Sequence, residues 1–329
     1  MDIRTLKTRN IINYFARDKK PLKGLLAFEW AVMAYWAFTL LLTLFAYTKL
    51  PNAQAMISER LHILAITVAM WAVYRIHPCR FTILCRVVVQ MALLARWYPD
   101  TYEFNRVLPN LDHVFAATEQ WMFGFQPALV FAAQMPSVVV SELMDMGYSM
   151  YYPMIAAVCF FYFFQCYKDF SRCAFIIMAA FFIYYVVFIF VPVAGPTFYY
   201  KAVGIDQIAR GVFPAVGDYF NFHQDCLPSP GCTDGLFYHL VESAKAAGER
   251  PTAAFPSSHV GMSTICMMLA WRSGSKKLFW ILMPIFVFLC FSTVYIQAHY
   301  AIDAIAGLLS GLLIYFALLY ASRHFKPLK

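Results

Sequence analysis

Residues 173–192 read CAFIIMAAFFIYYVVFIFVP, an apolar run without a single charged residue. A transmembrane helix needs about 20 predominantly apolar residues, so this stretch is long enough to cross a bilayer. Further apolar runs lie on both sides of it, at 25–48, 60–76, 81–97, 150–167, 257–272, 278–298 and 300–321. The pattern predicts an all-α, polytopic membrane helix bundle with six to eight transmembrane helices.

The composition of the whole chain agrees with a membrane protein. Of the 329 residues, 61% are hydrophobic and 13% are charged, whereas a soluble domain has about 45–50% apolar and about 25% charged residues. A soluble globular enzyme is therefore excluded. The formal net charge of +8 could indicate nucleic acid or anionic lipid as a partner, so the positions of the Lys and Arg residues decide its meaning.

The basic residues form five clusters at the ends of the apolar runs. The clusters are the segment 1–24 with Arg4, Lys7, Arg9, Arg17, Lys19, Lys20 and Lys23, then Arg75 and Arg80, Lys168 and Arg172, Arg272, Lys276 and Lys277, and Arg323, Lys326 and Lys329. Eight alternating spans place all five clusters on one side, which the positive-inside rule makes cytoplasmic. We therefore expect a multi-pass integral membrane protein with cytoplasmic termini, and no nucleic-acid partner.

Two long segments fall on the opposite, net acidic side. Residues 98–149 mix aromatic and charged residues around prolines, which predicts amphipathic helices on the outer membrane surface. Residues 193–256 are rich in Gly, Pro and Tyr and predict a folded loop. Within that loop Cys226 and Cys232 predict a local disulfide, because an outside compartment is oxidising. A zinc site is less favoured, since their spacing matches no standard ligand pattern.

The residues that carry chemistry lie in two short motifs. Residues 253–261 read AAFPSSHVG and precede an apolar helix, so Ser257, Ser258 and the free N–H groups of the first turn predict an anion site beside His259. Residues 297–303 read QAHYAID, in which His299 and Asp303 share a helix face. A carboxylate one turn away can hold an imidazole in one tautomer. The chain between the motifs crosses inward and back, so both motifs return to the outer surface.

A single interfacial histidine is more often structural than catalytic. Here, however, two histidines and an aspartate lie together with an anion-binding helix start. This combination favours a catalytic site for a phosphate. A metal site built from His259, His299 and Asp303 is less favoured, because the Ser-Ser turn would have no purpose in it. We therefore expect neither a metal nor a cofactor.

Both motifs resemble those of a known enzyme family. Pro256-Ser257-Ser258-His259 resembles the P-S-G-H motif of the type 2 phosphatidic acid phosphatase superfamily. Ser292 to Asp303 resembles its motif of S-R, five residues, H, three residues and D. The resemblance implies that His299 is a nucleophile forming a phosphohistidine, that Asp303 orients it, and that His259 is the general acid for the leaving oxygen. It also implies a catalytic membrane domain at 150–329, preceded by transmembrane and interfacial helices at 1–149.

The departures from the family's pattern narrow the expected substrate. Thr293 stands where the family has Arg, and the family's K, six residues, R-P motif is absent. The stretch GPTFYYK at 195–201 and the His-Tyr-x-x-Asp form at 299–303 resemble the inositol phosphorylceramide synthases and the related sphingomyelin synthases, and the inositol branch is closer. This resemblance implies transfer of phosphoinositol from a phospholipid donor to a ceramide-like acceptor.

Candidate substrate-binding residues follow from these motifs and from the acidic outer side. We expect the phosphate to meet Ser257, Ser258, Lys201 and Arg250, with Tyr199 nearby, and the hydroxyl groups of a neutral polyol head group to meet Asp100 and Asp112.

Two other functions remain open at this point. A lipid phosphate or polyprenyl diphosphate phosphatase would use the same histidines with water as acceptor, but it would lack the phosphate-clamping cations. A proton-coupled transporter would show discontinuous helices and internal pseudo-symmetry, neither of which is visible in the hydropathy pattern.

Overall fold

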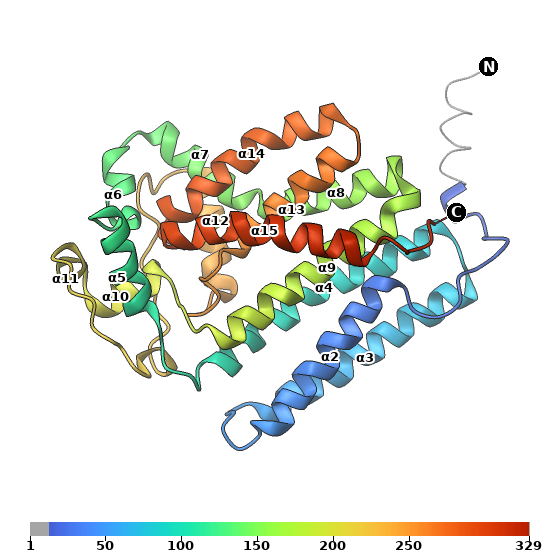
Figure 1. Cartoon of the computed structure of the whole chain (residues 1–329), viewed down its shortest axis with the longest axis horizontal. Coiled ribbons are helices and arrows are strands. Elements are labelled where there is room, and N and C mark those ends of the chain that lie inside the picture. The colour runs from blue at the N-terminus through green and yellow to red at the C-terminus, as the bar shows by residue number, and fades with distance from the viewer. Residues whose placement is uncertain (1–12, 329) are drawn as a thin grey trace.

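The helices of this protein form one bundle with a group of shorter helices at one end (Figure 1). The computed structural model describes residues 13–328, which contain helices and no strand. The basic residues Arg4, Lys7, Arg9 and Lys329 lie outside the described residues. The all-α fold expected from the apolar runs is confirmed.

Within residues 13–328, six helices are long and apolar enough to cross a membrane. They are α2 (Ala27–Phe45), α3 (Ala53–Ile76), α4 (Arg80–Asn105), α9 (Tyr167–Phe190), α14 (Lys276–Tyr295) and α15 (Ala301–Ala321). A seventh span is possible if α7 (Val138–Ser149) and α8 (Tyr151–Gln165), which meet at a 49° bend, count as one. The predicted polytopic bundle is thus confirmed, within the range of six to eight helices.

The arrangement of eight full spans needs a correction at α13 (Ser258–Arg272). This helix has 15 residues, which is about 22 Å at 1.5 Å per residue, shorter than the hydrocarbon core of a bilayer. It packs between α14 and α15 inside the bundle.

The end of α4 also differs from the prediction. We expected the span to stop at residue 97, before Pro99, but the helix continues to Asn105. A proline inside a helix removes one backbone hydrogen bond. Packing holds the helix together here, because Trp97 and Asp100 on either side of the proline are buried and Asp100 pairs with Arg60 of α3 at 3.0 Å.

The two outward segments contain α7 and several other short elements. The others are α5 (Asp112–Phe123), α6 (Pro127–Gln134), α10 (Pro196–Val203), α11 (Ile205–Ala209), the 3₁₀ turn Tyr219–Asn221 and α12 (Leu236–Gly248). The disulfide predicted between Cys226 and Cys232 is wrong, since both thiols are free. Cys226 packs with Phe198 and Phe220, while the backbone of Cys232 bonds to Ser141 of α7.

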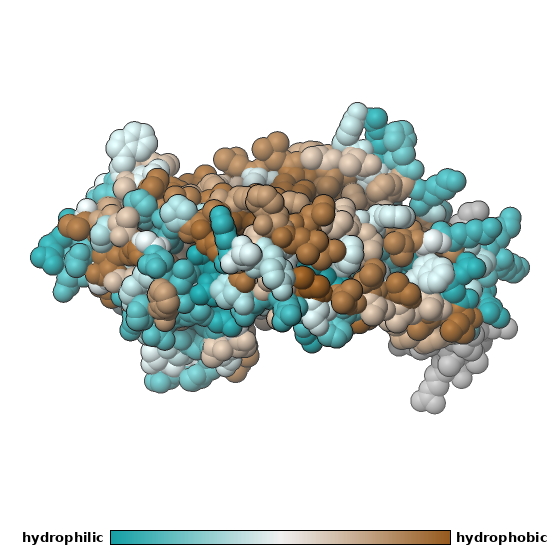
Figure 2. Space-filling view, turned by 90° about the horizontal axis from the view of Figure 1, so that it is seen from below, coloured by the Kyte–Doolittle hydropathy of each residue, from teal (hydrophilic) through white to brown (hydrophobic). Residues whose placement is uncertain are grey.

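The basic clusters within the described residues gather at one end of the bundle. The backbone N–H of Asp18 donates to Pro78 at 2.7 Å, and that of Leu328 donates to Lys168 at 3.1 Å, so the first and last parts of the described chain meet the loop before α4 and the start of α9. The helices α9 and α14 run from there to the opposite end, where the two motifs lie. Figure 2 shows an apolar surface over the middle of the molecule and more hydrophilic surface toward its ends.

Candidate active site

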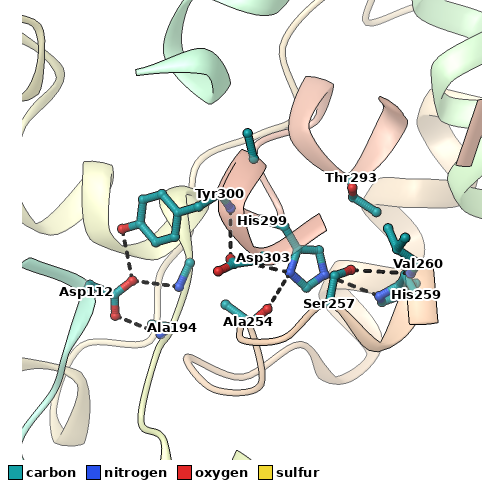
Figure 3. A network of polar contacts seen from close by, with 12 residues as sticks. Asp112, Ala194, Ala254, Ser257, His259, Val260, Thr293, His299, Tyr300 and Asp303 are labelled. Atoms are coloured by element: carbon teal, nitrogen blue, oxygen red, sulfur yellow. Dashed lines mark hydrogen bonds and ion pairs between the residues drawn. The ribbon is translucent and has the colours of Figure 1, made fainter. Parts of the chain in front are cut away.

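Glycines bring the starts of α13 and α15 into contact. A Cβ atom on Gly307 would lie 2.5 Å from the carbonyl oxygen of Ser257, and one on Gly311 would lie 2.6 Å from the carbonyl oxygen of Gly261. The Ser257 N–H donates to the carbonyl of Asp303 at 3.0 Å. This close crossing places the two sequence motifs side by side (Figure 3).

The imidazole of His299 is held by the backbone of the other motif. Its Nδ1 atom lies 2.8 Å from the carbonyl oxygen of Ala254. Because a carbonyl only accepts hydrogen bonds, Nδ1 carries the proton and Nε2 keeps its lone pair. Burial lowers the pKa of His299 to about 4, so the neutral, nucleophilic form predominates near pH 7.

The free Nε2 atom of His299 faces His259. It lies 3.4 Å from Nδ1 of His259, which stands in the first turn of α13. Ser257 caps this helix, and its hydroxyl accepts from the Val260 N–H at 3.4 Å. The N–H groups of Ser258 and His259 point out of the same turn, where a helix start favours an anion.

Two tyrosines from the bent pair α7–α8 hold the His259 ring. Tyr148 stacks on it at 4.6 Å between ring centroids, and Tyr151 lies at 4.3 Å. The bend at Met150 directs these side chains toward the histidine from two helices. Neither tyrosine was among the predicted site residues.

Asp303 lies next to His299, but Nδ1 of His299 keeps its hydrogen bond to the Ala254 carbonyl. Its Oδ2 atom lies 3.8 Å from Nδ1 of His299 and accepts from the Tyr300 N–H at 2.9 Å, which closes the first turn of α15. Its Oδ1 atom is buried without a hydrogen-bond partner. The carboxylate therefore supports the imidazole mainly through its charge and through the helix start that it caps.

Helix α5 contributes two buried acidic side chains to the same region. Asp112 accepts from the N–H groups of Ala194 and Gly195 at 2.7 and 2.8 Å, and from the Tyr300 hydroxyl at 3.1 Å. Burial raises the pKa of Asp112, while these bonds oppose the rise. Asp112 thus joins the loop after α9 to the start of α15.

Glu119, two turns further along α5, accepts from the Ala301 N–H. Burial, and the charge of Asp303 to a smaller extent, raise the pKa of Glu119 to about 8. It was not among the predicted residues, although its spacing from Asp112 places both acids on one face of a helix.

Comparison with known proteins identifies the family. The sequence profile of the PAP2 superfamily matches residues 112–317, which include both motifs. The chain belongs to the PAP2 superfamily. Searches of curated proteins and of solved structures give no match. The match begins at the start of α5; the domain division at 149 and 150 remains a prediction.

One departure from the PAP2 motif lies directly beside the nucleophile candidate. The carbonyl of Thr293 accepts from the His299 N–H at 2.9 Å, and the buried hydroxyl of Thr293 donates to Cys290 at 3.1 Å. Position 293 therefore adjoins the site but supplies no positive charge. Within residues 13–328, no Lys or Arg forms a hydrogen bond or ion pair with His259 or His299.

The structure does not bring all the predicted substrate-binding residues to this PAP2 site. Asp100 pairs with Arg60, and the buried Tyr199 hydroxyl donates to Pro214 at 2.8 Å. Lys201 is exposed and lines a surface pocket with Arg210. Arg250 is exposed and bonds to Gln224. Of that set, Ser257 and Ser258 adjoin the histidines, and Asp112 supports the loops around them.

Residues 13–328 contain no group of three or more His, Cys, Asp or Glu side chains arranged to hold a metal ion.

Proposed function

We propose that this PAP2 superfamily enzyme is a phosphotransferase that moves phosphoinositol from a glycerophospholipid to a ceramide-type lipid alcohol through a phosphohistidine on His299. The observation that carries the chemistry is the contact between Nε2 of His299 and Nδ1 of His259 at 3.4 Å. A phosphate bound there has a nucleophile on one side and a proton donor on the other.

In the first step, Nε2 of His299 attacks the phosphorus of the donor. Burial, and His299 to a smaller extent, lower the pKa of His259 to about 3, so His259 takes up a proton as the anionic phosphate binds beside it, because a nearby negative charge favours the imidazolium. The P–N bond then forms while the bond to the diacylglycerol oxygen breaks, and that oxygen takes the proton from His259. The Nδ1–H of His299 remains on the Ala254 carbonyl at 2.8 Å, which keeps Nε2 directed at the phosphorus. Charge developing on the phosphate meets the N–H groups of the Ser257–His259 turn.

In the second step, the acceptor hydroxyl attacks the same phosphorus. His259, now neutral, takes the hydroxyl proton, the new P–O bond forms, and the P–N bond breaks to restore His299. Direct contact between the rings means that the phosphate must enter by displacing His259 from His299. The ring of Tyr148 stacks on that of His259 and offers an apolar surface along which His259 can move.

The surroundings of the histidines support a diester donor over a terminal phosphate. A phosphate monoester is a dianion near pH 7 and benefits most from Arg and Lys partners. Thr293 occupies the position where such a cation is expected, and the rings of Tyr148 and Tyr151 cover His259. A singly charged phosphodiester depends less on cations, and an apolar surface suits a lipid acceptor.

The position of the site supports an outward-facing reaction. The motifs lie at the end of the bundle opposite the basic clusters, so the positive-inside rule assigns them to the periplasmic, luminal or outer face and the basic end to the cytoplasm. No metal or cofactor takes part in the proposed steps.

The test is a reaction of purified protein with defined lipids, followed by mass spectrometry. With phosphatidylinositol and a ceramide, we expect diacylglycerol to appear in step with a new inositol phospholipid, and removal of the ceramide to slow diacylglycerol release. Phosphatidic acid and a polyprenyl diphosphate should be poor substrates. Rapid phosphate release from phosphatidic acid, with no ceramide-dependent product, would instead assign the protein to the lipid phosphatases.

A further inference from the structure

A cavity of about 390 Å³ opens at the end of the bundle opposite the basic clusters. It lies between the turn that joins α2 to α3, the residues that follow α4, and the 3₁₀ turn Tyr219–Asn221. Its lining includes Lys49, Arg106, Leu108, Asp218, Asn221 and Phe222, and none of the residues that the proposed mechanism uses. Sites for small molecules commonly measure about 300–1,000 Å³, so the cavity has room for a lipid head group.

The two cations of this cavity come from segments that packing and hydrogen bonds hold in place. Leu50, in the turn before α3, is buried in one apolar cluster with Phe104 of α4, which fixes the position of the neighbouring Lys49. Arg106 donates from Nε to the Asn221 side chain at 3.3 Å and from Nη2 to the Asn221 carbonyl at 3.2 Å. The cavity is therefore built by contacts between three separate parts of the chain.

Part of the charge in the cavity has no partner within the described protein. Arg106 pairs with Glu103 at 3.5 Å, which offsets one positive charge. Among residues 13–328, the side chains of Lys49 and Asp218 are exposed and form no hydrogen bond or ion pair, with each other or with any other residue. The cavity thus offers one free ammonium and one free carboxylate, a combination that suits a ligand with both an anionic group and hydrogen-bond donors.

Apolar side chains surround the opening of the cavity. Val107, Leu108 and Phe222 line it and are exposed, and Phe45 at the end of α2 is exposed beside it in the sequence. In the proposed orientation, these ends of α2, α3 and α4 lie where the head groups of the outer leaflet meet the acyl chains. The positive-inside rule makes Lys and Arg scarce on that side, so topology gives no reason for a cation at position 49.

A second, narrow space adjoins the cavity on the side of the catalytic loops. It shares Arg106 and Asp218 with the cavity and continues to Pro192 and Pro251. Its volume of about 20 Å³ leaves room for about one water molecule. A head group in the cavity therefore stays separate from His299.

We infer that this cavity binds the head group of a membrane phospholipid at a site separate from the histidines. Lys49 and Arg106 bind the phosphodiester, and Asp218 accepts hydrogen bonds from hydroxyl or ammonium groups of the head group. The acyl chains lie along the exposed apolar residues at the opening. The inference goes beyond the proposed function and does not depend on it, because it concerns binding without reaction.

The experiment is photo-crosslinking of the full-length chain carrying His299→Ala, which removes the proposed nucleophile. A phosphatidylinositol with a diazirine near the start of one acyl chain is added in detergent micelles, and the crosslinked peptides are located by mass spectrometry. Lys49→Gln and Asp218→Asn are compared with Arg210→Gln, which removes an exposed cation elsewhere in the outward loop. The competitors are phosphatidylethanolamine, phosphatidylmethanol, whose head group has no hydrogen-bond donor, and inorganic phosphate.

We expect crosslinks at residues 107–109 and at Phe222. At a subsaturating lipid concentration their yield should fall by about five- to tenfold in Lys49→Gln, as for the loss of one charge-assisted hydrogen bond, and should not change in Arg210→Gln. Phosphatidylethanolamine should compete better than phosphatidylmethanol, and Asp218→Asn should remove that difference.

Three results would overturn the inference. One is an equal yield of these crosslinks in Lys49→Gln and Arg210→Gln, and another is crosslinking confined to other segments. The third is displacement of the lipid by inorganic phosphate at an equal concentration, which would make the cavity a site for free phosphate. Failure of the proposed function is a separate result, because none of these measurements depends on turnover.

Discussion

Nδ1 of His299 donates to the backbone carbonyl of Ala254 at 2.8 Å, a shorter contact than the 3.8 Å that separates it from Asp303. The tautomer of the proposed nucleophile is therefore held by the chain that leads into the P-S-S-H motif. The two motifs depend on each other, since one supplies the imidazole and the other its acceptor.

This relationship limits the expected effect of Asp303→Asn. The amide keeps an oxygen for the Tyr300 N–H but removes the negative charge that stabilises an imidazolium, so we expect kcat to fall by up to about 100-fold with little change in KM. Steady-state kinetics of the lipid reaction measure both constants. A loss as large as that of His299→Ala would contradict a supporting role and make Asp303 the principal partner of the imidazole.

The crossing of α13 and α15 predicts a strong effect of a single methyl group. In Gly307→Ala the new Cβ would lie 2.5 Å from the Ser257 carbonyl, so the helices must separate, at a cost of about 1–3 kcal/mol. We expect a lower Tm and a loss of activity. Gly248→Ala, where nothing lies within 4 Å of the new Cβ, should change neither. Equal stability of the two variants would show that the helices do not cross this closely.

The acidic side chain of Glu119 predicts a pH-dependent stability. Because its pKa is raised to about 8 in the folded protein, the folded state holds a proton that the unfolded chain releases near pH 4.3. The stabilisation is present at low pH and is lost as the pH rises through about 8. Glu119→Gln should therefore have a higher Tm than the wild type at pH 9 and lose less stability between pH 5 and 9. Parallel Tm curves for the two proteins would show that Glu119 is ionised throughout.

Orientation in the membrane can be tested by cysteine labelling. We expect Ala215→Cys, in the outward loop, to react with an impermeant reagent in intact cells, and Lys277→Cys, at the start of α14, to react only after permeabilisation. Both positions are exposed, and labelling is measured above the wild-type background of nine native cysteines. The reverse pattern would place the histidines on the cytoplasmic side.

Much of the fold follows from the apolar runs, because a membrane span has a length and a composition that sequence displays directly. The boundaries of the helices are predicted less well from the sequence. Pro99 is a helix-breaking signal, yet α4 passes through it because Trp97 and Asp100 pack against other helices. Cys226 and Cys232 are close in sequence, but separate packing partners keep both thiols free.

The candidate active site, too, is predicted from the sequence only in part. His259, His299 and Asp303 lie in motifs with short, recognisable spacing, and the structure brings them together. The Ala254 carbonyl is part of the backbone and has no side-chain signal, while Tyr148 reaches the site from a helix far away in sequence. Asp112 was singled out as a head-group ligand because it is acidic, but only its tertiary contacts show that its oxygens bind the protein's own N–H groups.

The central claim is a covalent intermediate on His299, and the most direct measurement is mass spectrometry of the protein after brief reaction with phosphatidylinositol in the absence of acceptor. The account predicts a mass increase equal to one phosphoinositol group, localised to His299, absent in His299→Ala, and removed when ceramide is added. A phosphoinositol adduct that persists in His299→Ala, or ceramide-dependent turnover by that variant at the wild-type rate, would contradict it.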